Sequence, residues 1–216
     1  WNGLFQYSSN TTQLYWVFNQ SIPMWLILSM ILNLKDKNNI LFLSSISFFF
    51  SPYATIGLLP IAIYLFIKDN DNLKKSILSP EIAFSIIILI ILGSFYKSGN
   101  GTVQSGFIFQ IVKNKWIILP SYILFIILEL SLPVLTTYQL NKKDILYKIL
   151  LIELLVIPVY VITENNDFCM RSSIPALFFL MIYFIKYLET NRKKNILIYC
   201  LLIISFINPI HEIARS

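Results

Sequence analysis

The sequence predicts an all-α protein, a polytopic bundle of transmembrane helices with about six to eight membrane segments. Two observations lead to this prediction. The chain has 216 residues, of which 56% are hydrophobic and 13% are charged, whereas soluble domains carry roughly 25% charged residues. The charged residues also cluster, and the apolar stretches between the clusters approach or reach the roughly 20 residues that a bilayer-spanning helix needs.

The first segment, residues 1–20, mixes aromatic side chains with Ser, Thr, Asn and Gln and carries no charge. Trp and Tyr collect at membrane interfaces, so we expect an interfacial segment or a loop that lies on the membrane. The first span is expected at 22–34, and it ends at the charged run Lys35-Asp36-Lys37.

The next apolar run, 40–67, is interrupted by Ser51-Pro52. Proline has no amide proton and clashes with the preceding helical turn, and the residue before it disfavours helix as well. The run is therefore either one long kinked span or two half-length helices that meet at the break. Lysines flank both ends of the run. If both flanking loops are cytoplasmic, the chain must enter the membrane and return, which favours a hairpin.

The rest of the chain contains five further apolar runs separated by polar or charged loops. Spans are expected at 82–96, 116–138, 145–163, 174–188 and 196–208, and the short piece 107–112 is expected at the interface.

The basic residues divide unequally between the two sides of such a bundle. Four loops carry most of them, near residues 36, 71, 142 and 192. When these loops are taken as cytoplasmic, that side holds twelve of the 17 Lys and Arg residues, in agreement with the positive-inside rule. The exterior segments are then 1–21, 97–115, 164–173 and 209–216. Orientation thus accounts for the net charge of +6, and we expect the lipid bilayer, not nucleic acid, as the partner.

We expect a single transmembrane domain, 1–216, in a multi-pass protein of a cell membrane, specifically a bacterial plasma membrane. The chain begins at Trp1 instead of Met and ends at Ser216 just after an apolar run. An internal fragment of a longer membrane protein is therefore expected.

The densest polar cluster on the expected exterior side is 164–171, ENNDFCMR. Asp167 and Arg171 are its candidate catalytic residues. A carboxylate at the mouth of a helix can act as a general base or bind a metal, and the planar guanidinium suits phosphate oxygens. The structural alternative is a solvated loop with a local Asp–Arg ion pair or a helix cap.

Two carboxylates, Glu129 and Glu153, lie about midway along their expected spans. A charged side chain at the bilayer centre costs roughly 2.5–3.5 kcal/mol on insertion scales, so both are expected to face the bundle interior or a wet cavity. The functional interpretation is an ion or proton relay. The structural interpretation, a neutral or hydrogen-bonded glutamate, is favoured because relays usually contain more charges within the membrane.

The N-terminal segment offers an aromatic and amide surface. Tyr7, Asn10 and Trp16, with Asn166 from the exterior loop, are candidate substrate-binding residues, because aromatic faces stack on sugars and amides hydrogen-bond to hydroxyl groups. The alternative is an ordinary interfacial aromatic belt.

No zinc motif, phosphate-cradling Gly-rich loop or nucleophile elbow is present in the sequence. The two cysteines, Cys169 and Cys200, form no CxxC pair, and His211 is the only histidine. No metal site is predicted, and the cofactor, a divalent metal included, is left open.

Three stretches together resemble a known group of proteins: 6–26 (QYSSNTTQLYWVFNQSIPMWL), 51–64 (SPYATIGLLPIAIY) and 166–180 (NDFCMRSSIPALFFL). They resemble large bacterial multi-pass membrane proteins that are grouped with the C-type (GT-C) glycosyltransferases. That resemblance implies the use of polyprenyl-phosphate sugars. The family's hallmark is an acidic residue in the first exterior loop, which is expected upstream of Trp1. No catalytic carboxylate is therefore carried over, and Asp167 is only a candidate for a second exterior acid.

The leading functional hypothesis is a glycosyltransferase-like enzyme of cell-envelope assembly, which takes a sugar from a lipid-phosphate donor at the exterior face. The alternatives are a transporter or flippase for lipid-linked saccharides that uses Glu129 and Glu153 in a central cavity, a polysaccharide polymerase, and a non-catalytic membrane subunit.

Overall fold

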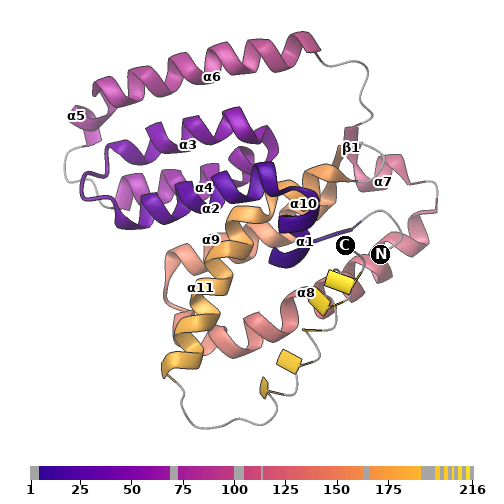
Figure 1. Cartoon of the computed structure of the whole chain (residues 1–216). Coiled ribbons are helices and arrows are strands. Elements are labelled where there is room, and N and C mark those ends of the chain that lie inside the picture. The colour runs from indigo at the N-terminus through magenta and orange to yellow at the C-terminus, as the bar shows by residue number, and fades with distance from the viewer. Residues whose placement is uncertain are drawn as a thin grey trace.

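The computed structural model describes residues 5–68, 73–99, 105–112, 114–162 and 166–190, with 198–199, 202–203, 206, 209–210 and 213–214. Most of this part of the chain is helical, as the sequence predicts (Figure 1). The first half holds α1 (Asn10–Trp16), α2 (Phe18–Asn33), α3 (Asn39–Phe50), α4 (Pro52–Lys68), α5 (Leu73–Ile77) and α6 (Pro80–Gly99). The second half holds β1 (Ser105–Phe107), α7 (Ile108–Ile111), α8 (Lys115–Asn141), α9 (Ile145–Val156), the 3₁₀ turn η1 (Ile157–Val159), β2 (Tyr160–Ile162), α10 (Asp167–Ser172) and α11 (Ile174–Thr190).

The break at Ser51-Pro52 separates α3 from α4, and the two helices pack against each other. Ser51 has extended backbone angles (φ −155°, ψ 102°), and Pro52 begins α4, where its missing N–H leaves no helical hydrogen bond unmade. Near the turn, the hydroxyls of Ser47 and Thr55 lie 2.7 Å apart. The run 40–67 therefore forms two helices of a hairpin and not one kinked span.

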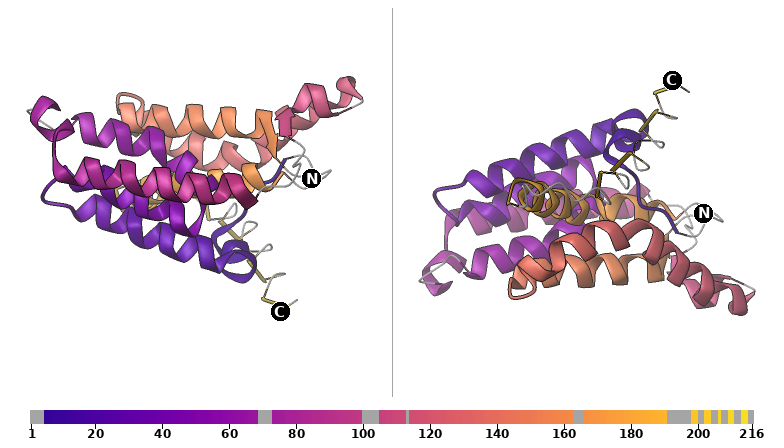
Figure 2. Two further views of the ribbon diagram at one scale, coloured as in Figure 1. Left: turned by 90° about the horizontal axis from the view of Figure 1, so that it is seen from above. Right: turned by 90° about the horizontal axis from the view of Figure 1, so that it is seen from below.

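The connections between helices gather at two ends of the bundle. Figures 1 and 2 place the α2–α3 and α8–α9 connections and the last turns of α4 and α11 at one end, and β1, α7 and α10 at the other. At the first end, the Tyr183 hydroxyl on α11 donates a hydrogen bond to Asp144 Oδ2 before α9. The distribution of basic residues in the sequence separates the same two sets of segments. We call the end of the bundle that holds β1, α7 and α10 the hairpin end.

Helix α11 lies at the centre of the bundle, where it packs against α2, α4, α8 and α9. Its first half is buried, including Ile174, Ala176 and Phe179. On α9, Tyr147 is fully buried, and its hydroxyl lies 2.8 Å from that of Thr137 on α8. The core thus joins helices from both halves of the chain.

Two helices of the described chain, α6 and α8, are long and apolar enough to cross a membrane. Only 6% of the most apolar window of α6 and 17% of that of α8 are buried, so their apolar side chains mostly face outward. Helices α3 and α4 are apolar as well but shorter. Helices α4 and α8 contain prolines, Pro60 in α4 and Pro120 and Pro133 in α8.

Some expected boundaries differ from the structure. Within 1–20, expected as an interfacial segment or a loop, Asn10–Trp16 form α1, and the Ser9 hydroxyl caps this helix by accepting from the Thr12 N–H at 3.1 Å. The expected span 145–163 ends as a helix at Val156, because Pro158 supplies no N–H for further helical turns. The expected run 196–208 lies mostly outside the described residues.

A two-stranded antiparallel sheet closes the hairpin end. Strand β1 pairs with β2 through Ser105 and Ile162, Gly106 and Val161, and Phe107 and Tyr160. The sequence predicts a membrane span through residue 163 and an interfacial piece at 107–112, and it does not predict this pairing. The pairing joins the chain between α6 and α8 to the chain between α9 and α10, and it brings α10 beside the sheet.

Candidate functional site

Asp167 and Arg171 lie one turn apart on α10, at the hairpin end. Arg171 Nη2 is 3.4 Å from Asp167 Oδ2, and the side chains are 27% and 33% exposed, respectively. An ion pair of this kind on a helix contributes only about 0.3–0.5 kcal/mol. The Nε of Arg171 is buried and has no hydrogen-bond partner among the described residues. The guanidinium therefore retains a buried N–H without an acceptor in the described part of the chain.

Asn166 fixes the start of α10. Its backbone is left-handed (φ 50°, ψ 46°), and its side-chain oxygen accepts from the Cys169 N–H at 3.3 Å. Asn tolerates this conformation better than most residues. The side chain is fully buried, so the sequence candidate for sugar binding serves in the structure as a helix cap that positions Asp167.

Cys169 lies on the inner side of α10 and is fully buried. Burial raises the pKa of its thiol to about 12, although a hydrogen bond from the backbone of Gln6 acts in the opposite direction. The thiol is therefore protonated at neutral pH and is a poor nucleophile. Its contact with Gln6 shows that the N-terminal segment before α1 packs against the inner side of α10.

Two of the three N-terminal candidates, Tyr7 and Asn10, meet at a cavity of about 260 Å³. Its wall also contains Ser8, Ser9, Glu129, Pro133, Leu177, Leu180, Met181 and Phe184. The buried Tyr7 hydroxyl donates to the Leu154 carbonyl, and Asn10 Nδ2 lies 3.0 Å from the Met181 sulfur. We call this space the Glu129 cavity. It combines a carboxylate, an amide and hydroxyls with apolar side chains.

Trp16 and Asn166 are not part of the Glu129 cavity. Trp16 ends α1 and is 59% exposed. The structure thus brings Tyr7, Asn10 and Glu129 together, holds Asp167 and Arg171 as a separate pair, and leaves Trp16 at the surface.

Glu153 lines a different cavity, of about 390 Å³, between α4, α9 and α10. The two carboxylates therefore do not share one central cavity. Helix α9 ends at Val156, so Glu153 lies in its last turn. The expected position, midway along a span, is therefore wrong for Glu153. Both carboxylate oxygens of Glu153 are buried without a hydrogen-bond partner among the described residues.

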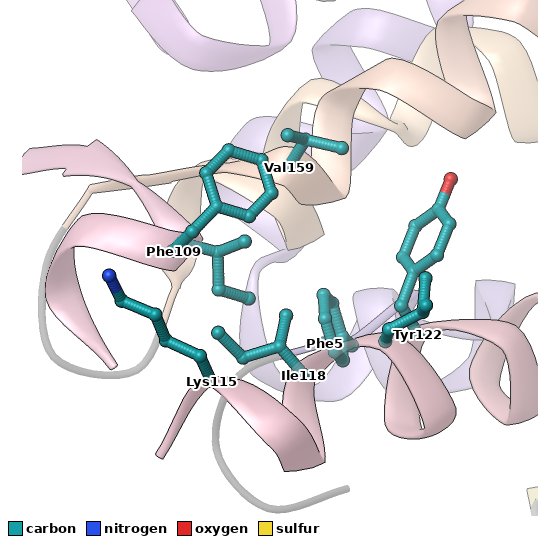
Figure 3. Close-up of a pocket in the computed structure, with 8 residues that line it drawn as sticks. Phe5, Phe109, Lys115, Ile118, Tyr122 and Val159 are labelled. Atoms are coloured by element: carbon teal, nitrogen blue, oxygen red, sulfur yellow. The ribbon is translucent and has the colours of Figure 1, made fainter. Parts of the chain in front are cut away.

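A third cavity, of about 310 Å³, lies between α7, α8 and η1 at the hairpin end (Figure 3). Its wall consists of Phe5, Ile108, Phe109, Lys115, Ile118, Leu119, Tyr122 and Val159. Lys115 is the basic side chain of this otherwise largely apolar wall, and Figure 3 shows it on the side of Phe109, with Tyr122 at the far end. We call it the Lys115 pocket.

Sequence reasoning missed the Lys115 pocket and Gly57. Lys115 opens the long apolar helix α8, and a lysine at the edge of an apolar run was read only as an orientation signal. Gly57 lies where α4 meets α10, and a Cβ atom built on it would be 1.9 Å from the Ser172 carbonyl oxygen and 3.1 Å from Glu153 Oε1. A lone glycine in an apolar helix gave no sign of this contact.

Within the described chain, no three His, Cys, Asp or Glu residues lie close enough together to hold a metal ion. No protein-family model matches the sequence, and comparison with curated proteins and with solved structures gives no match. The resemblance to C-type glycosyltransferases therefore stays a prediction that depends on the three stretches quoted above.

Proposed function

We propose that the protein is a multi-pass plasma-membrane protein of bacterial cell-envelope assembly, with six to eight membrane segments. It acts as a glycosyltransferase on a lipid-phosphate-linked sugar at the exterior face, which corresponds to the hairpin end. The long apolar helices α6 and α8, whose side chains mostly face outward, support a location in the bilayer. The excess of Lys and Arg at the opposite end supports the orientation.

The observation that carries this proposal is the partly exposed Arg171 guanidinium 3.4 Å from the Asp167 carboxylate, with an Nε that has no hydrogen-bond partner among the described residues. A phosphate can accept from the guanidinium nitrogens in the bidentate manner that suits arginine. The Lys115 pocket, at the same end, offers an apolar wall with one cation. A lipid phosphate fits both features, because its apolar chain suits the apolar wall and its phosphate suits the cationic side chains.

In the proposed reaction, Asp167 accepts the proton of the acceptor hydroxyl while that oxygen attacks the sugar carbon. The bond between this carbon and the phosphate oxygen breaks, and Arg171 stabilises the negative charge that develops on the leaving phosphate. Tyr7 and Asn10 at the Glu129 cavity supply the aromatic and amide groups for the sugar of the acceptor. Asn166 positions the reacting helix and does not touch the substrate.

The test is transfer of a radiolabelled sugar from a polyprenyl phosphate to a lipid-linked acceptor in membranes that contain the protein. We expect Asp167→Ala and Arg171→Ala each to lower the rate by about 10²-fold or more, the usual contribution of a positioned acid–base or charge-stabilising group. Asp36→Ala and Lys142→Ala, at the opposite end of the bundle, serve as matched controls and should retain the rate. Unchanged transfer in both α10 variants would show that the site assignment is wrong.

A transporter or flippase for lipid-linked saccharides is the second candidate, because Glu153 is a buried carboxyl without a described partner. Glu129 and Glu153 line separate cavities, which counts against a single relay through both. Proton-coupled transport in reconstituted vesicles that Glu153→Gln abolishes would favour this function over transfer.

A further inference from the structure

The cavity next to Glu153 is a third candidate binding site, distinct from the Asp167–Arg171 pair and the Lys115 pocket. We call it the Glu153 cavity, and its wall consists of Ile56, Gly57, Pro60, Ile149, Ile152, Glu153, Val156, Ile157, Tyr160, Phe168 and Ser172. Helices α4 and α9 form its two sides, and α10 with β2 closes it toward the hairpin end. Nearly all of this wall is apolar.

Glu153 is the exception. The residue is only 8% exposed, and neither carboxylate oxygen has a hydrogen-bond partner among the described residues. A buried polar group without a partner is costly, so a native structure that keeps one has a reason for it. The Ser172 hydroxyl is no partner, because it donates to the Tyr53 carbonyl at 2.9 Å.

Gly57 makes the space in which the carboxylate lies. Glu153 Oε1 is 3.1 Å from the position where a Cβ atom of residue 57 would be. The carboxylate therefore rests against the bare backbone of α4, and its buried oxygens lie behind the apolar wall of the cavity. A side chain at this position would push it away or fill the space.

The rim of the Glu153 cavity is apolar and exposed. Ile56 is 44% exposed, and Ile152 and Val156 are each 61% exposed. In a protein whose helices lie in a bilayer, such a rim faces hydrocarbon, so the cavity opens sideways to lipid and not to water. Its occupant is therefore a molecule dissolved in the membrane.

The depth of the carboxylate indicates how such a molecule lies. Glu153 is in the last turn of α9, close to the hairpin end, whereas Ile149 and Pro60 lie about one turn farther from that end. A hydrogen-bond donor near the head of a lipid would meet the Glu153 carboxyl when this side chain turns toward the cavity, and the chain would continue past Ile149 and Pro60. The aromatic pair of Tyr160 and Phe168, with ring centres 5.9 Å apart, covers the head end.

We propose that the Glu153 cavity binds an amphiphile whose apolar chain carries a hydroxyl or amine donor next to it, and that this donor hydrogen-bonds to the Glu153 carboxyl. The proposal rests on the bilayer location given under the proposed function, but it does not depend on sugar transfer. The Glu153 cavity and the Lys115 pocket differ in the head group that each accepts. An anionic head group has no hydrogen-bond donor to offer the Glu153 oxygens, whereas Lys115 can pair with it.

The test uses the full chain in phosphatidylcholine nanodiscs and three photoactivatable probes with the same alkyl chain: a primary alcohol, a primary amine and a methyl ether without a donor. Crosslinked peptides are identified by mass spectrometry. We expect the alcohol, the amine or both to label peptides of α4 and α9 about 3- to 10-fold more than the ether, a ratio that one net hydrogen bond supports.

Three variants sharpen the test. Glu153→Leu should lower labelling to the level of the ether, and it should fold because it replaces an unpaired buried acid with an apolar side chain. Glu153→Gln should keep alcohol labelling, since the amide oxygen still accepts, and should reduce amine labelling. Glu129→Gln, in the other cavity, should change nothing.

Equal labelling by the ether and by both donor probes, or donor labelling that survives Glu153→Leu, would overturn the proposal. Neither result bears on sugar transfer by Asp167 and Arg171, so failure of one proposal can be distinguished from failure of the other. A hydroxyl lipid and an amine lipid are distinguished by which probe labels, and by whether Glu153→Gln reduces the labelling.

Discussion

Gly57 lets two pieces of backbone touch that lie more than a hundred residues apart in the sequence. The Ser172 carbonyl oxygen occupies the place of a side chain at residue 57, only 1.9 Å from where a Cβ atom would be. The Ser172 hydroxyl adds a hydrogen bond to the Tyr53 carbonyl of the same helix. Helix α10, which carries Asp167 and Arg171, is thereby fixed to α4 by backbone contacts.

The first prediction at the residue scale follows from this contact. Gly57→Ala should destabilise the protein by about 1–3 kcal/mol, because overpacking forces the backbone of α4 or α10 to move. Unfolding in detergent, followed by circular dichroism, measures the change. Gly93→Ala is the matched control in α6, where no atom of the described residues outside the helix's own backbone lies within 4 Å of the added Cβ, and it should stabilise by about 0.5–1 kcal/mol. Equal effects of the two substitutions would contradict the contact.

At this scale the sequence could name candidate residues but not how they are partnered. Asp167 and Arg171 are four residues apart, and their ion pair was one of the alternatives that the spacing left open. The separation of Glu129 from Glu153 was not predictable, because it depends on which helices line each cavity. The role of Asn166 as a cap was hidden for a similar reason, since the same amide could bind a sugar or a backbone N–H.

At the scale of elements, the sequence predicts helices in most apolar runs that are bounded by charges, although the helix in the run 145–163 ends early, at Val156. The hairpin at Ser51-Pro52 was one of two alternatives, and the charge of the flanking loops selected the correct one. The short strand β2 was missed, because an apolar stretch such as 157–162 is compatible with helix and strand alike. Its pairing with β1 depends on a segment more than fifty residues earlier, which no local pattern records.

The hairpin makes a prediction about topology. In a background without native cysteines, Lys37→Cys and Lys74→Cys should react with a membrane-impermeant maleimide from the same side of the membrane, since α3 and α4 enter and return. Ser98→Cys, at the far end of α6, should react from the opposite side. Intact cells and inverted vesicles provide the two measurements. Labelling of positions 37 and 74 from opposite sides would show that the run 40–67 crosses the membrane once.

At the scale of the whole molecule, the prediction is that lipid and not water surrounds the outer helices. Large apolar side chains are exposed along α6 and α8, among them Ile90, Phe95 and Leu135, and their exposure to water would be costly. We expect the protein to stay in the membrane pellet after extraction with alkaline carbonate, while a peripheral membrane protein is released as the control. Recovery of a folded monomer from the supernatant without detergent would contradict the proposed bilayer location.

Prolines within α4 and α8 lie at the walls of two of the cavities. Pro60 has no N–H to offer the Ile56 carbonyl, and Pro133 has none for that of Glu129, four residues earlier in each helix. Pro60 lines the Glu153 cavity, and Pro133 lines the Glu129 cavity. In each helix the ladder of backbone hydrogen bonds is therefore interrupted beside a cavity, and helices kink most readily at proline. A change in the width of either cavity is thus expected to involve a bend of α4 or α8 at these positions.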